Sequence, residues 1–126
     1  MSAAIEKFGL LCDALWAKTS ENKVPWRTEG NLIAFDSGPN VCLIKRSSNS
    51  NGDDIYTVSL LNGSGVVLES FDNETLVDIA PSSNFENYFQ LLDALFERGR
   101  RQATGADVAL DDLLHRLESE TLDIPF

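Results

Sequence analysis

Apolar side chains recur with helical spacing near both ends of the chain. The first stripe predicts an amphipathic helix over residues 2–19 and consists of Ile5, Phe8, Leu11, Cys12 and Leu15. A second helix is expected to begin at Ser83, because the run from Ser83 to Glu86 has the form of a capping box. Its apolar positions are Phe85, Tyr88, Phe89, Leu92, Leu95 and Phe96. Thr104-Gly105 ends this helix, and a third stripe follows at Leu110, Leu113, Leu114 and Leu117.

Four shorter segments between these helices are typical of β-strands. They cover residues 31–36, 41–46, 54–61 and 66–71. In the third segment, Tyr56, Val58 and Leu60 alternate with polar residues, as in a strand with one buried face. Residues 37–40 and 62–65 are rich in glycine, asparagine and serine, which favour turns. A short edge strand is also possible around Leu76, and Pro81 would end it.

This order of elements predicts a single α+β domain over residues 1–126. We expect an N-terminal helix, a four-stranded antiparallel meander and two C-terminal helices packed on one face of the sheet. The helix that carries Leu110 to Leu117 either extends the helical layer or reaches a second subunit.

Composition and charge narrow the classes of partner. The chain is 43% hydrophobic and 24% charged, as in soluble globular proteins. Its apolar runs are too short to cross a bilayer, and Glu6 and Asp13 argue against a secretory signal, so we expect a cytoplasmic protein. The formal net charge of −10 disfavours nucleic acids and anionic membranes. The same charge is compatible with a basic or a purely apolar protein partner.

Candidate catalytic residues are few. His115 is the single histidine, and Cys12 and Cys42 both fall in apolar patterns, so no catalytic residue, metal site or cofactor site is predicted. The two thiols are expected to be buried and reduced, with a disulfide as the less favoured alternative. The paired acids Asp53-Asp54 and Asp111-Asp112 are interpreted as solvated charges, because adjacent side chains diverge.

Three other features are candidate partner-binding sites. Arg98, Arg100 and Arg101 form a basic cluster, which either pairs with Glu97 and the helix dipole or binds an acidic segment. Trp26 either packs in the core or stacks on a ligand. The tail, residues 118–126, carries apolar side chains at alternate positions, so we expect it to dock in an apolar groove of its own or a neighbouring subunit. Those side chains are Leu122, Ile124 and Phe126.

The succession of elements resembles a group of short uncharacterised bacterial proteins with an N-terminal helix, a β-meander and C-terminal helices. The residues that carry the resemblance are the Val24-Pro25-Trp26 segment, the strand from Tyr56 to Leu60, and the aromatic and arginine positions from Tyr88 to Arg101. The resemblance implies an α+β fold and no particular activity. In size and acidity the chain is also similar to type III secretion chaperones, which place a helix between their third and fourth strands, whereas the strands here run consecutively.

Three functional hypotheses follow from these observations. The leading one is a non-catalytic protein-interaction module that forms a homodimer. The second is an acidic chaperone or immunity-type protein that masks a basic effector. The third is a small-molecule binder or weak enzyme that uses the sheet face as a cup. It requires polar groups to converge in a pocket near Trp26, Arg27 or Tyr56.

Overall fold

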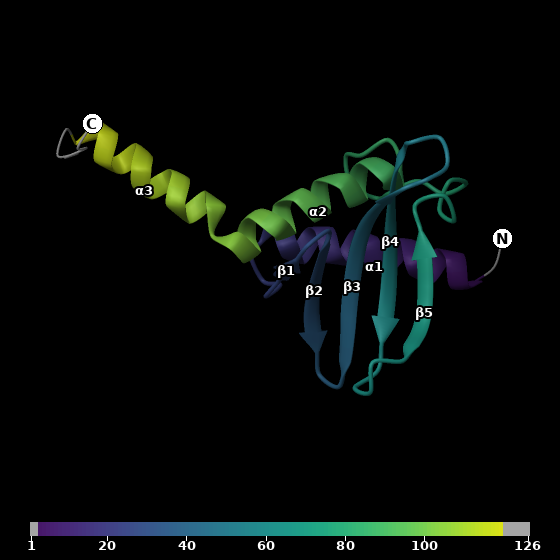
Figure 1. Cartoon of the computed structure of the whole chain (residues 1–126). Coiled ribbons are helices and arrows are strands. Elements are labelled where there is room, and N and C mark those ends of the chain that lie inside the picture. Colours follow the sequence, from purple (N-terminus) through teal and green to yellow (C-terminus); the bar gives the residue numbers. More distant parts are fainter. Residues whose placement is uncertain (1–2, 120–126) are drawn as a thin grey trace.

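The computed structural model describes residues 3–119. A helix, α1 (Ala3–Ser20), precedes five strands, and two helices, α2 (Tyr88–Thr104) and α3 (Ala106–Glu118), follow them. The strands are β1 (Arg27–Glu29), β2 (Leu32–Ser37), β3 (Asn40–Ser48), β4 (Asp54–Leu61) and β5 (Val67–Asp72). They form one antiparallel meander in the order β1-β2-β3-β4-β5 (Figure 1). The predicted α+β class is confirmed.

The sheet has five strands, so the predicted number of four is wrong. The additional strand, β1, pairs with β2 through Thr28 and Ile33. It is only three residues long and all three are polar, so it shows no apolar alternation that a pattern search could detect. As the sequence indicated, no helix interrupts the strands, which departs from the arrangement of the secretion chaperones.

One face of the sheet carries the core. Ile33, Ile44, Val58 and Phe71 stand opposite one another across β2, β3, β4 and β5, and none is more than 4% exposed. Burying a side chain of this size contributes roughly 1.5–3 kcal/mol. Both α1 and α2 lie on this face, where they cover the row (Figure 1).

The start of α2 differs from the prediction. The helix begins at Tyr88 rather than at Ser83, and Asn87 is its N-cap, accepting a 2.8 Å hydrogen bond from the backbone N–H of Gln90. The Gln90 side chain in turn accepts from the backbone N–H of Glu86 at 3.0 Å. A variant of the capping that we expected therefore exists four residues later, in which the N3 side chain reaches the residue before the N-cap. Phe85 precedes the helix and packs edge-on against Trp16, with ring centroids 5.0 Å apart.

The segment between β5 and α2 forms turns, so the edge strand considered around Leu76 is wrong. Thr75 and Asp72 bond to each other through backbone and side-chain groups, and Leu76 continues the turn by donating to the carbonyl of Asn73. The Leu76 side chain is fully buried. The Leu76 side chain therefore packs in the core from a turn and is not part of a strand face.

The two C-terminal helices have different environments. Gly105 separates them with φ of +73°, a left-handed conformation that glycine adopts without a steric penalty. α2 packs on the sheet, whereas α3 extends away from the body and has no buried residue (Figure 1). The expectation that both helices pack on the sheet holds for α2 alone. The core face is already filled by α1 and α2, so no apolar surface is left there for α3.

The remaining predictions about the fold concern termini, thiols and membranes. Cys12 and Cys42 are buried and free, as expected. Within residues 3–119, no helix has the length and apolar character needed to cross a bilayer. The predicted docking of the tail through Leu122, Ile124 and Phe126 lies outside the described residues.

Candidate functional site

The arginine cluster at the end of α2 diverges. Arg98 reaches back to α1, where its Nη2 donates to the carbonyl of Ser20 at 3.1 Å and its guanidinium lies 6.0 Å from the Trp16 ring centre. This contact satisfies a carbonyl at the end of α1 that has no partner within that helix. The first arginine therefore joins α1 to α2.

The other two arginines pair with different acids. Arg100 binds Glu97 one turn earlier at 2.8 Å. Arg101 bonds through Nε to Asp107 at 2.9 Å, which links α2 to α3 across Gly105. Pairing between Glu97 and Arg101, which the sequence suggested, is absent because Arg101 points past the glycine. The three side chains thus make their bonds to three different helices.

Trp26 belongs to the core, in agreement with the first of its two interpretations. It is 6% exposed and stacks edge-on against Phe35, with ring centroids 4.9 Å apart. Its indole N–H donates to the hydroxyl of Thr19 at 2.9 Å, and Thr19 is itself fully buried. Gly99 of α2 lies against the ring, where an added Cβ would stand 3.2 Å from it.

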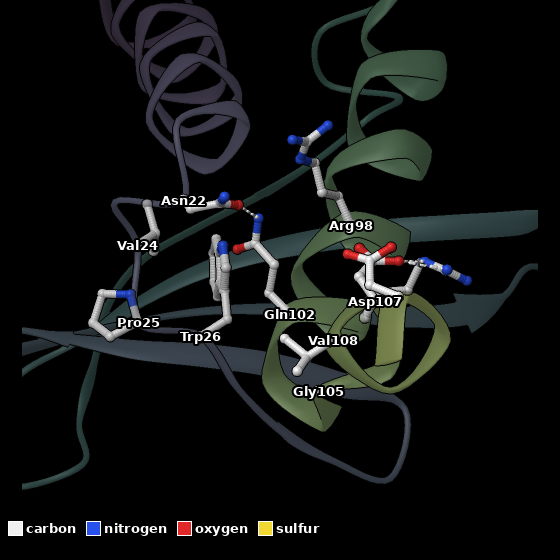
Figure 2. A pocket seen from close by; sticks show the side chains of 11 residues that line it. Asn22, Val24, Pro25, Trp26, Arg98, Gln102, Gly105, Asp107 and Val108 are labelled. Atoms are coloured by element: carbon white, nitrogen blue, oxygen red, sulfur yellow. Dashed lines mark hydrogen bonds and ion pairs between the residues drawn. The ribbon is translucent and has the colours of Figure 1, made fainter. Parts of the chain in front are cut away.

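A cleft of about 400 Å³ opens beside Trp26, between the end of α1 and the junction of α2 with α3. Figure 2 shows Val24 and Pro25 on one side of it and Val108 with Asp107 on the other. Apolar and charged groups are mixed in the lining. This is the pocket near Trp26 that the third hypothesis requires, although it lies at the helix junction and not on the sheet face.

Most of the polar groups that line this cleft bond within the chain. Gln102 donates to the side chain of Asn22 at 2.6 Å and to the carbonyl of Thr19 at 2.9 Å (Figure 2). Arg98 and Arg101 hold the contacts described above. A ligand would have to displace these bonds to make its own, which lowers the affinity such a cleft can offer.

A second hollow, of about 440 Å³, lies at the other end of the sheet. Three carboxylates line it, from Asp53, Asp54 and Glu74, together with the exposed ring of Phe89. This arrangement gives the acidic surface of the molecule one concave region with an aromatic wall. These carboxylates do not form a metal site, and among residues 3–119 no three His, Cys, Asp or Glu side chains are placed to hold one metal ion.

A polar network between the sheet and α2 was missed from the sequence. The Tyr56 hydroxyl donates to Asp93, and the Arg46 guanidinium bonds Glu97 at 3.1 Å while lying 5.0 Å from the Phe96 ring centre. Burial, followed by the hydrogen bond to Asp93, raises the pKa of Tyr56 well above its usual value. The phenol is therefore a weaker acid than in water.

This network fastens the sheet to α2. The Tyr56 phenol stays protonated near neutral pH, and Arg46 stays charged, so neither offers a base that could accept a proton. The signal that could have placed Arg46 here is the alternation of Cys42, Ile44 and Arg46 on one face of β3.

The single histidine and the two thiols are far from forming a catalytic group. His115 lies on exposed α3, whereas Cys12 and Cys42 lie in the core. Burial raises the pKa of each thiol to about 12, so both stay neutral near pH 7. A neutral, buried thiol is a poor nucleophile and a poor metal ligand.

An exposed apolar surface lies on α3, the leucine face, formed by Leu110, Leu113, Leu114 and Leu117. Each of these side chains is between 46% and 54% exposed. Their spacing places all four on one side of the helix. Comparison of the chain with family models, curated proteins and solved structures gives no match.

Proposed function

We propose that this chain is a non-catalytic protein-binding module and that the leucine face of α3 is its contact surface. The observation that carries the proposal is that α3 presents four leucines at helical spacing while none of its residues is buried. A contiguous stripe of leucines normally packs in a core or in an interface. The side chains of Arg98, Arg101 and Gln102 at the cleft, by contrast, already bond within the chain.

The length of α3 supports the same proposal. A helix of 13 residues without tertiary packing is marginal in water, because helices shorter than ~12–15 residues rarely hold together alone. Two ion pairs stabilise α3, Arg101–Asp107 and Arg116–Asp112. Both are exposed, so each contributes no more than about 1 kcal/mol to the stability of the helix. Burial of the leucine face by a partner would supply the missing stabilisation.

Co-purification from the native host with the Leu113→Asp, Leu117→Asp variant tests this function. Because α3 adds nothing to the core, the variant should fold as the wild type does and lose its bound protein. The matched control is Leu10→Asp with Val77→Asp, which adds the same charge at sites 67% and 74% exposed elsewhere. Loss of binding by the control, or retention by the α3 variant, would contradict the proposal.

A second candidate is an acidic protein that binds a basic effector. The observation that favours it is the hollow lined by Asp53, Asp54 and Glu74 beside the exposed Phe89, on a chain of net charge −10. A lysine or arginine side chain could enter with its charge against the carboxylates and its stem against the ring. Such binding must weaken as salt is raised, and affinity unchanged between low and high ionic strength would exclude it.

A further inference from the structure

We infer that the outer edge of β5 is a docking site for an extended, basic peptide segment, which adds to the sheet as a sixth strand. β5 and α3 lie at opposite ends of the molecule, so this inference is independent of the leucine face (Figure 1). It rests on the second candidate function, because it names the binding mode of the basic partner considered there.

β5 is an edge strand that the chain leaves open. It pairs with β4 on one side, and no other strand of residues 3–119 lies on its other side. Three consecutive apolar residues around its start are exposed, Val66 at 57%, Val67 at 55% and Leu68 at 56%. A bulge interrupts the ladder at this run, and residues 69–72 stay in regular register. An exposed apolar edge is a template for a further strand, and proteins that do not use one usually cover or shorten it.

The opposite edge of the sheet is built differently. β1 is three residues long and polar throughout. Short, polar edge strands are one of the ways in which proteins prevent unwanted strand pairing. The chain therefore closes one edge of its sheet and leaves the other accessible.

The middle of β5 directs backbone groups outward. At the end of the strand, the N–H of Asn73 donates to the carbonyl of Tyr56 on β4 at 3.2 Å. Residues of an antiparallel pair alternate between those that bond the neighbouring strand and those that do not, so Ser70 directs its N–H and carbonyl away from β4. The N–H of Asp72 also points outward, and the Thr75 hydroxyl accepts it at 3.4 Å. An added strand therefore pairs along Ser70 and ends where this turn begins.

The first turn of α1 already overhangs the position of a sixth strand. α1 crosses the core face of the sheet toward β5, where Phe8 stacks on Phe71 with ring centroids 4.2 Å apart. The helix begins at Ala3, about 7.5 Å beyond Phe8 at ~1.5 Å per residue, and Figure 1 shows this end beyond β5. A neighbouring strand lies only about 4.8 Å from β5, so α1 covers its core face.

The charge around this edge selects the chemistry of the partner. Residues 47–96 contain eight acidic side chains and no lysine, arginine or histidine. Glu69 lies on β5 itself. Beyond Asp72 the chain enters the acidic hollow described above, whose carboxylates belong to Asp53, Asp54 and Glu74. A strand added to β5 therefore ends at this hollow, where its lysine or arginine side chains meet the carboxylates.

The same charge disfavours a second copy of β5 as the occupant. Two β5 strands paired edge to edge would place the acidic side chains of both, Glu69 and Asp72, along a contact six residues long. Each copy also carries a net charge of −10, so the two repel each other. A basic segment of another protein carries the opposite charge and is attracted to the edge.

Fluorescence anisotropy with a synthetic peptide tests the inference. The probe has blocked ends and about eight residues, lysine alternating with valine, which matches the length of one strand. It should bind, and the same peptide with methylated backbone amides should bind at least about 10-fold more weakly, because methylation removes the donors of a strand ladder and keeps the charge. Equal binding by the two peptides, or no binding of the probe up to about 1 mM at low salt, would overturn the inference.

Two substitutions at Ser70 test the position. Ser70→Pro removes an N–H that does not bond β4, so the sheet should persist and the peptide should bind roughly 10-fold more weakly. Ser70→Ala is the matched control, because it keeps the N–H and loses only the hydroxyl, which lies 3.2 Å from that of Ser59. It should bind the peptide as the wild type does. Binding unaffected by a folded Ser70→Pro variant would contradict pairing along this edge.

Backbone chemical shifts of the wild type locate the peptide without any substitution. Changes on peptide addition should fall on residues 67–74 and at the start of α1. Changes confined to β1, α2 or α3 would overturn the edge site. Circular dichroism checks the fold of each variant, and if Ser70→Pro unfolds, the methylated probe and the shift map decide.

These results separate the inference from the functions proposed above. Methylated and unmethylated peptides that bind equally and dissociate as salt is raised overturn strand addition and leave the acidic candidate standing. Leu113→Asp with Leu117→Asp should not change peptide binding, and its loss there would place the peptide on α3 and overturn the edge site. A dimer of the chain that Ser70→Pro abolishes, seen by sedimentation without peptide, would make a second copy the occupant.

Discussion

At the scale of single residues, the contact between Thr19 and Trp26 holds the start of the sheet against the end of α1. Both residues are buried, and the indole N–H has the Thr19 hydroxyl as its acceptor at 2.9 Å. Thr19→Val keeps the shape and removes the acceptor, which leaves a buried donor unpaired at a cost of about 1–3 kcal/mol.

A double-mutant cycle isolates this hydrogen bond. In a Trp26→Phe background the donor is already absent, so the same Thr19→Val substitution should cost roughly 1–2 kcal/mol less than in the wild type. Urea unfolding of the four proteins measures the difference. Equal costs in the two backgrounds would show that the hydrogen bond contributes nothing.

The buried thiols predict a fall in stability at alkaline pH. Burial raises the pKa of Cys12 and Cys42 to about 12, whereas an unfolded thiol titrates near pH 8.5. Below pH 8.5 both states hold the proton and the full stability is present. Between pH 8.5 and about 12 only the folded state keeps it, so the free energy of unfolding falls as pH rises.

Each thiol contributes a slope of roughly −1.4 kcal/mol per pH unit in that window. Unfolding of the wild type and of Cys42→Ala at a series of pH values measures its share. The substitution should reduce the slope by about that amount, whatever it does to the stability at pH 7. An identical slope in the two proteins would contradict the assignment.

At the scale of elements, long periodic segments were predictable and short or locally capped ones were not. The apolar patterns of the sequence correctly located α1 and the strands β2, β3, β4 and β5, because the same side chains pack in the core. β1 was not predicted, because a strand of three residues is too short to show an apolar pattern. The start of α2 was predicted too early, because Phe85 continues the apolar spacing of the helix although it packs against Trp16 from outside it. Local rules gave the right capping chemistry at the wrong residue.

The candidate site was less predictable than the fold. The leucines of α3 are visible in the sequence, but a stripe at helical spacing is the same whether it meets a core or a solvent-facing partner surface. The partners of Arg98 and Arg101 lie on α1 and α3, and no local pattern carries those contacts. The Tyr56–Asp93 bond joins residues 37 positions apart, so it required the packing of α2 on the sheet.

Substitution of Gly105 tests how firmly the orientation of α3 relative to α2 is fixed. At φ of +73° an alanine is strained by about 1 kcal/mol, and at Gly65, with φ of +81°, the strain is similar. Gly65 lies in a closed hairpin, so Gly65→Ala should lower the free energy of unfolding by that full amount. α3 has no packing to hold it in place, so the Gly105→Ala junction can relax toward a continuous helix and should cost less.

Urea unfolding compares the two variants, and backbone chemical shifts of residues 104–106 report whether residue 105 has become right-handed. A Gly105→Ala variant that loses as much stability as Gly65→Ala and keeps the left-handed junction would show that α3 is held firmly in its direction.

At the scale of the whole molecule, the chain divides its apolar residues between two tasks. The aromatic and aliphatic side chains of the sheet, α1 and α2 close a single core, and the polar network around Tyr56 and Arg46 fastens that core at its rim. α3 stands outside this unit and holds its leucines in solvent. The packed unit therefore lies within residues 3–104, and we propose that α3 provides the partner contact.

Hydrogen exchange of the backbone amides of α2 and α3 tests this division most directly. The amides of residues 110–118 should exchange quickly in dilute protein, because a helix with no buried residue opens readily. Those of α2 should be strongly protected, because this helix packs on the sheet. Protection of the α3 amides equal to that of the α2 amides would contradict the division.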